Sequence, residues 1–143
     1  NDNVLGSHDY KLVGGANALG IDMNDESSLD DKVTRELHLV VGEPVLLKLR
    51  SQDIIHSAFM PHFRVQMNCV PGMTTQFVFT PNKTTSEMKM LEGEDFEYVL
   101  LCNKICGVAH YNMQMKVIVE TKEEYDKWLS EQSTLSEKLL TQK

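Results

Sequence analysis

Four side chains that can bind a metal lie within twelve residues of the chain. Cys102, Cys106, His110 and Met113 supply two thiols, an imidazole and a thioether. Soft sulfur ligands combined with imidazole select copper or zinc over hard cations, and a weak thioether ligand favours copper in particular. The cluster therefore predicts a copper-binding loop.

The two cysteines of this loop also have other interpretations. A C-x-x-x-C pair occurs as a disulfide, as two small buried hydrophobic residues, or as half of a structural zinc site. Zinc sites usually combine C-x-x-C turns with a second Cys/His pair, which the sequence does not supply. The loop needs a further ligand, and His56 is the best candidate, although a lone histidine beside apolar residues is more often a core residue.

Short segments of alternating polarity flank the loop and predict the strands that position it. They are residues 37–41, 45–49, 75–80, 96–101 and 114–120, separated by turns that contain glycine or proline. The metal-binding loop then connects two strands of an antiparallel all-β domain. His56 is expected where an apolar strand runs out into a loop. After Glu120 a capping-box sequence and helical spacing predict a helix from about residue 122.

The composition is that of one ordinary globular domain with an irregular beginning. Of 143 residues, 41% are hydrophobic and 24% are charged, which excludes a disordered or collagenous chain. The net charge is -7 and the basic residues are scattered, so a nucleic-acid partner is not expected. No apolar stretch approaches the ~18 residues of a membrane-spanning helix. We expect an acidic, glycine-rich segment at 1–35, a β domain at 36–121, and a C-terminal helix and tail at 122–143.

Two motifs together resemble the copper-binding domain of cytochrome c oxidase subunit II, which carries the binuclear CuA centre. The C-x-E-x-C-G-x-x-H-x-x-M motif is matched by Cys102, Cys106, Gly107, His110 and Met113. The motif D-V-x-H-S-x-x-x-P, followed by V-x-M-x-x-V-P-G, is matched by Asp53, His56, Ser57, Pro61, Val65, Met67, Val70, Pro71 and Gly72. The resemblance covers roughly residues 36–130, with both motifs in the family's order.

The resemblance implies a fold and a ligand set. The fold would be all-β, a Greek-key β-barrel or sandwich of the cupredoxin type with a C-terminal α-helix. Two copper ions would be bridged by the thiolates of Cys102 and Cys106. His56 and Met113 would complete one copper, and His110 with the backbone carbonyl of Lys104 would complete the other.

The resemblance also implies partners and a compartment. As the electron-entry subunit of an oxidoreductase, the domain would accept electrons from cytochrome c and pass them to haem in oxidase subunit I, and by itself would reduce no oxygen. It would lie on the periplasmic face of the bacterial inner membrane, with its membrane anchor outside these residues. Three alternatives remain: the CuA domain of an enzyme like nitrous-oxide reductase, a copper-binding or assembly protein, and a structural zinc module.

The sequence departs from the family pattern at several positions. Lys104 stands where the family usually has Glu, and Asn68 where it often has Asp. Copper would use only the carbonyl of Lys104, but we do not expect the family's usual magnesium site at the interface with subunit I. We interpret Cys69 as a buried small hydrophobic residue and not as a ligand. Trp128, the single tryptophan, is expected to pack in the C-terminal helix.

Overall fold

The structure is a computed structural model that describes residues 4–15, 17 and 19–141. The chain divides into two compact units, which are described separately. The sheet unit comprises Arg35–Lys127, and the terminal unit comprises Asn1–Thr34 with Trp128–Lys143. In the part of the chain that the structure describes, no helix has the length and apolar character needed to span a membrane.

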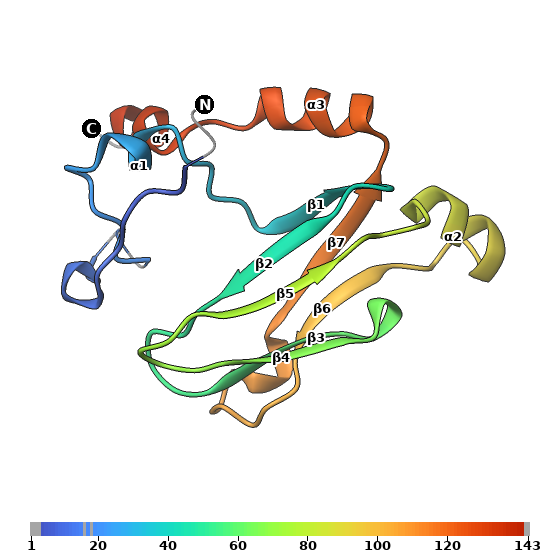
Figure 1. Ribbon diagram of the computed structural model, residues 1–143, viewed down its shortest axis with the longest axis horizontal. Helices are drawn as coiled ribbons and strands as arrows, with labels where there is room; N and C mark the ends of the chain where they lie inside the picture. The colour runs from blue at the N-terminus through green and yellow to red at the C-terminus, as the bar shows by residue number, and fades with distance from the viewer. Residues whose placement is uncertain (1–3, 16, 18, 142–143) are drawn as a thin grey trace. The chain divides into compact units, whose positions relative to one another are not determined.

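Seven strands form the sheet unit (Figure 1). They are β1 (Glu36–Val40), β2 (Val45–Leu49), β3 (His56–Met60), β4 (Val65–Cys69), β5 (Thr75–Phe79), β6 (Tyr98–Cys102) and β7 (Gln114–Glu120). Five of them form one sheet in the order β1-β7-β6-β3-β4, and β2 pairs with β5 in a second sheet. The β1–β7 pair is parallel, whereas the others are antiparallel. The expectation of a purely antiparallel domain was therefore wrong at this edge of the sheet.

The hydrophobic core lies between the two sheets. Its buried members are Leu39, Met60, Val65, Tyr98, Val117 and Val119. Val45 and Leu47 of β2 and Phe77 and Phe79 of β5 pack against this cluster. Each of these strands has a side-chain period of two, so one of its faces reaches the core, as the alternating sequence pattern predicted.

Sequence patterning did not identify three elements of the sheet unit: strands β3 and β4 and a helix that follows β5. Strand β4 follows a short 3-10 helix, Pro61–Phe63, that turns the chain back from β3. Helix α2 (Thr85–Glu92) begins with a capping box, in which the Thr84 hydroxyl accepts from Glu87 N and the Glu87 carboxylate accepts from Thr84 N. The T-x-x-E signal for this helix was present in the sequence.

The terminal unit joins the N-terminal segment to the end of the chain. Its elements include a 3-10 helix (Tyr10–Leu12), α1 (Glu26–Leu29), the end of α3 (Lys122–Glu131) and α4 (Leu135–Thr141). Asp31 O accepts a hydrogen bond from Leu135 N at 2.8 Å, and Val33 O accepts one from the Lys138 ammonium at 2.6 Å. The helical region expected from residue 122 is thus confirmed, but it consists of two helices.

Candidate metal centre

The predicted ligands come from two segments that meet at one end of the five-stranded sheet. His56 is the first residue of β3, and Cys102 is the last residue of β6. The two strands are antiparallel neighbours with Ala58 opposite Cys102. This register places the start of β3 beside the loop between β6 and β7 (Figure 1). The expectation that a strand ends before His56 was wrong, because the loop ends there and a strand begins.

Backbone hydrogen bonds fix the 103–113 loop at its base. Cys102 N donates to Met113 O at 3.0 Å and closes the loop, while Asn103 N donates to Ser57 O at 3.0 Å and joins it to β3. Within the loop, Gly107 has φ +132°, a conformation that disfavours any residue with a Cβ. A short 3-10 helix, His110–Asn112, then leads back to β7.

All six predicted donors lie close together around the two thiols. The Cys102 and Cys106 sulfurs are 3.6 Å apart. Cys102 Sγ lies 3.8 Å from His56 Nδ1 and 3.3 Å from the carbonyl oxygen of Lys104. Cys106 Sγ lies 3.5 Å from His110 Nδ1 and 3.2 Å from Met113 Sδ. Segments 46 residues apart in the chain thus converge on one site.

This donor set fits copper. His56, Cys102 and Cys106 offer ligand atoms within 4.8 Å of one another. Three sulfurs, two imidazole nitrogens and one carbonyl oxygen form a soft set that copper prefers over calcium or magnesium. Structural zinc sites use thiolates and imidazoles without a thioether, so Met113 beside Cys106 favours copper over zinc.

The two thiols differ in acidity. Burial alone would raise the pKa of Cys102, but backbone hydrogen bonds at Ser57 and Lys104, with further bonds from His56 and Cys106, lower it to about 6. Partial burial and the neighbouring Cys102 raise the pKa of Cys106. The metal-free site therefore contains one thiolate and one thiol at neutral pH, and the thiolate is the form that binds metals.

His56 is contacted on both sides of its ring. Its Nε2 lies 2.7 Å from Asp53 Oδ1, opposite the nitrogen that faces Cys102. This hydrogen bond is the main reason why the pKa of His56 is raised and why that of Asp53 is lowered to about 2. The sequence placed Asp53 in a motif but did not reveal this contact, since spacing alone does not show which ring nitrogen is bonded.

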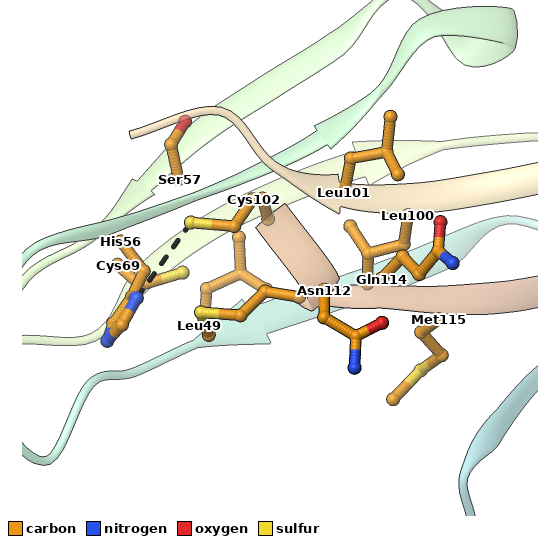
Figure 2. Close-up of a pocket in the computed structure, with 12 residues that line it drawn as sticks. Leu49, His56, Ser57, Cys69, Leu100, Leu101, Cys102, Asn112, Gln114 and Met115 are labelled. Carbon is orange, nitrogen blue, oxygen red and sulfur yellow. Dashed lines mark hydrogen bonds between the residues drawn. The ribbon is translucent and has the colours of Figure 1, made fainter. Parts of the chain in front are cut away.

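Three of the candidate donors, His56, Cys102 and Met113, line a pocket of about 320 Å³ (Figure 2). Most of its other lining is apolar: Leu49, Ala58, Leu100, Leu101 and Met115. Cys69 also lines it, directly opposite His56 in the β3–β4 register. Cys69 is half-buried, not fully buried as expected, and burial raises the pKa of its thiol.

The remaining histidines of the sheet unit lie in other surroundings. His62 is exposed and makes edge contacts with the rings of Phe96 and Tyr98, at centroid distances of 4.9 and 5.6 Å. His38 Nδ1 lies 2.6 Å from Glu120 Oε1, on the strand next to its own. Neither is among the residues that contact the two thiols.

Comparison with known proteins identifies the family. Residues 19–121 match the family model for cytochrome C oxidase subunit II, periplasmic domain. The chain is 37% identical over 137 residues to the alternative cytochrome c oxidase subunit 2 of Bradyrhizobium diazoefficiens, covering 94% of this chain and 46% of that protein. It is 36% identical over 97 residues to cytochrome c oxidase subunit 2 of Thermostichus vulcanus, covering 67% of this chain and 26% of that protein.

A solved structure supports the fold. The periplasmic domain of cytochrome oxidase subunit II (CoxB) of Bradyrhizobium japonicum superposes with a TM-score of 0.57 at 22% identity, covering 68% of this chain and 62% of that one. The mainly β, cupredoxin-type architecture with a C-terminal helix is thereby confirmed. The chain spans less than half the length of the two curated relatives described above. By its sequence match and its fold, it belongs to the family of cytochrome c oxidase subunit II periplasmic domains.

Proposed function

We propose that this chain is the electron-transfer domain of a terminal oxidase and holds a binuclear CuA centre. In this proposal the thiolates of Cys102 and Cys106 would hold both copper ions. His56 and Met113 would supply further donors to one copper, and His110 with the carbonyl of Lys104 would supply them to the other. The observation that carries the proposal is the convergence of six donors of the right chemistry at one end of the sheet. Bound copper would supply the ability to take up and release one electron.

The protein's own part is to keep the donors still. The Cys102–Met113 and Asn103–Ser57 backbone hydrogen bonds fix the loop to two paired strands. An apolar pocket adjoins His56, Cys102 and Met113 on one side. Ligands that do not move when the charge of the site changes keep the reorganisation energy small, which permits fast electron transfer.

The outer side of the loop is suited to contact with other proteins. Ile105, Val108 and Tyr111 are 87%, 98% and 89% exposed. Three largely exposed apolar side chains within one short loop favour an interaction surface there. We propose that the chain receives electrons from cytochrome c and passes them to haem in oxidase subunit I, on the periplasmic side of the bacterial inner membrane and with its membrane anchor outside these residues.

The sequence alone left three alternatives: a domain from an enzyme like nitrous-oxide reductase, a copper-binding or assembly protein, and a structural zinc module. Membership of the oxidase subunit II family favours none of them. The family match leaves the number of metal ions open, so the experiment that tests the proposal has to count them.

Copper reconstitution followed by optical and electron paramagnetic resonance spectra tests the binuclear site. We expect a purple species whose hyperfine pattern shows one unpaired electron shared by two coppers. Cys102→Ser is expected to abolish this signal, because it removes a bridging thiolate, while Cys69→Ser leaves it intact. A single-copper spectrum, or binding of zinc alone, would contradict the proposal. An essential Cys69 would overturn the ligand assignment.

A further inference from the structure

The two imidazoles of the site are held in different ways. His56 contacts Cys102 through Nδ1 and Asp53 through Nε2, whereas His110 contacts Cys106 through Nδ1. Among the residues that the structure describes, no carboxylate forms a hydrogen bond or ion pair with His110. One of the two histidine ligands thus has a carboxylate behind it and the other does not.

The carboxylate determines which nitrogen of His56 is free to bind metal. A carboxylate accepts hydrogen bonds, so the short 2.7 Å contact places the ring proton on Nε2. Nδ1, which faces the Cys102 sulfur, is then the nitrogen left to bind a metal. In metal sites such a hydrogen bond fixes the tautomer and the orientation of the ring, and it increases the basicity of the metal-binding nitrogen.

The local turn holds Asp53 in this position. The Ser51 hydroxyl lies 3.2 Å from Asp53 Oδ1 and also contacts the carbonyl oxygen of Ile54. Ser51 itself forms a β-bridge with Pro71, just after β4. The turn that presents the carboxylate is thus joined at Ser51 to the segment just after β4, while His56 belongs to the sheet as the first residue of β3.

We infer that Asp53 is a positioning residue that orients His56 and lowers the reduction potential of the centre, an inference that rests on the copper site proposed above. A more electron-rich imidazole stabilises the oxidised metal more than the reduced metal, so the potential falls. The Asp53 side chain is 67% exposed, so water screens its charge at a distance. Asp53 therefore changes the potential mainly through its hydrogen bond to Nε2 of His56, and it does not act on His110 in this way.

An ordinary surface contact is the competing explanation. Exposed ion pairs three residues apart often contribute little to stability, and the Asp53–His56 pair has this spacing. A contact of that kind would change neither the affinity for copper nor the potential. Both quantities are therefore measured, in addition to the stability of the metal-free protein.

The test compares Asp53→Asn and Asp53→Glu with the wild type after copper reconstitution. Asparagine keeps an oxygen near Nε2 but removes the negative charge, while glutamate keeps the charge and shifts its position. Glu94→Gln is the matched control, because it removes an exposed carboxylate in the turn before β6, while the ligand Cys102 lies at the other end of that strand. Copper affinity is measured by chelator competition, the potential by redox titration, and stability by thermal unfolding without metal.

We expect Asp53→Asn to weaken copper binding about 10- to 100-fold, the range usual for such outer hydrogen-bond partners. The reduction potential of Asp53→Asn should shift to more positive values. The copper affinity and potential of Asp53→Glu should lie between those of Asp53→Asn and the wild type. The thermal unfolding of the metal-free protein should be the same in all of them. Complete loss of copper with unchanged metal-free unfolding also supports the inference. An Asp53→Asn protein with the affinity and potential of Glu94→Gln would overturn it. A wild-type protein without the binuclear spectrum would instead refute the proposed function, so the two failures are distinguishable.

Discussion

Strands β3 and β6 each have two unlike ends. At one end of the pair, Met60 and Tyr98 are 0% and 4% exposed and lie in the core between the sheets. At the other end, His56 and Cys102 are only half-buried and offer an imidazole and a thiol that could bind a metal. Each strand has five residues, so about four residue steps separate a core side chain from a candidate donor.

This difference shows where the precision of the site originates. The metal-binding end has little apolar packing of its own, and its loop is mostly exposed. Its donors are held by strand pairing and by the hydrogen bonds at the base of the loop. Packing at the buried end holds the two strands in place, and the paired strands in turn hold the candidate donors. The two ends should therefore respond differently to substitution.

The largest expected difference concerns stability. Met60→Ala removes a fully buried side chain and should lower the free energy of unfolding by about 2–5 kcal/mol. His56→Ala, on the same strand, removes mainly a hydrogen bond to an exposed carboxylate and should cost about 1 kcal/mol in metal-free protein. Chemical denaturation of both variants without metal measures the two values. Equal losses would show that the two ends are not energetically distinct.

A smaller effect is expected in the chemistry of the metal-free thiols. Cys102, with a pKa of about 6, should be mostly thiolate at pH 7, whereas the pKa values of Cys106 and Cys69 are raised. Because a less basic thiolate is also less nucleophilic, the net advantage of Cys102 toward iodoacetamide at pH 7 should be modest, at least about threefold. The rate at which iodoacetamide alkylates Cys102 should fall as the pH falls through about 6.

Peptide mapping by mass spectrometry after alkylation at several pH values measures these rates separately. The rates of Cys106 and Cys69 should still rise with pH above 8 and serve as internal references. If all three thiols show the same pH midpoint, the hydrogen bonds to Cys102 do not stabilise its thiolate.

The smallest effect is expected on the outer side of the loop. Val108→Ser should slow electron transfer from reduced cytochrome c about two- to threefold, because most single contacts at an interface contribute less than about 1 kcal/mol. Val78→Ser, which replaces a 61% exposed valine of β5, is the matched control. Stopped-flow kinetics measures the rates, and both variants should keep the copper spectrum of the wild type. If the two variants have equal rates, the loop is not the contact surface.

Much of the fold could be predicted because β-strands have a period of two. Val45 and Leu47, like Phe77 and Phe79, alternate with polar or exposed residues, and each set packs against the core. Strand β4 has a similar alternation but follows a 3-10 turn that the pattern does not indicate. The parallel pairing of β1 with β7 depends on contacts between residues about 80 positions apart, which local sequence does not contain.

The proximity of the candidate donors could be predicted from the sequence, but their individual contacts could not. Spacing and family motifs indicated which residues to consider, because the kind of donor atom is a property of single residues. The Asp53–His56 hydrogen bond depends on the ring orientation of His56, and the half-burial of Cys69 depends on its place opposite His56. Such features follow from strand register, which is determined only when the whole sheet has formed.

The backbone hydrogen bonds at the base of the 103–113 loop have a consequence for how this domain can diverge. They involve main-chain atoms, so they do not depend on the side chains at the tip of the loop. The side chains of Ile105, Val108 and Tyr111 are exposed to solvent. Between them in the sequence, Cys106 contacts the Cys102 sulfur and His110 contacts the Cys106 sulfur. The loop is therefore modular: substitutions at its exposed positions can change the outer surface of the domain without moving the candidate donors.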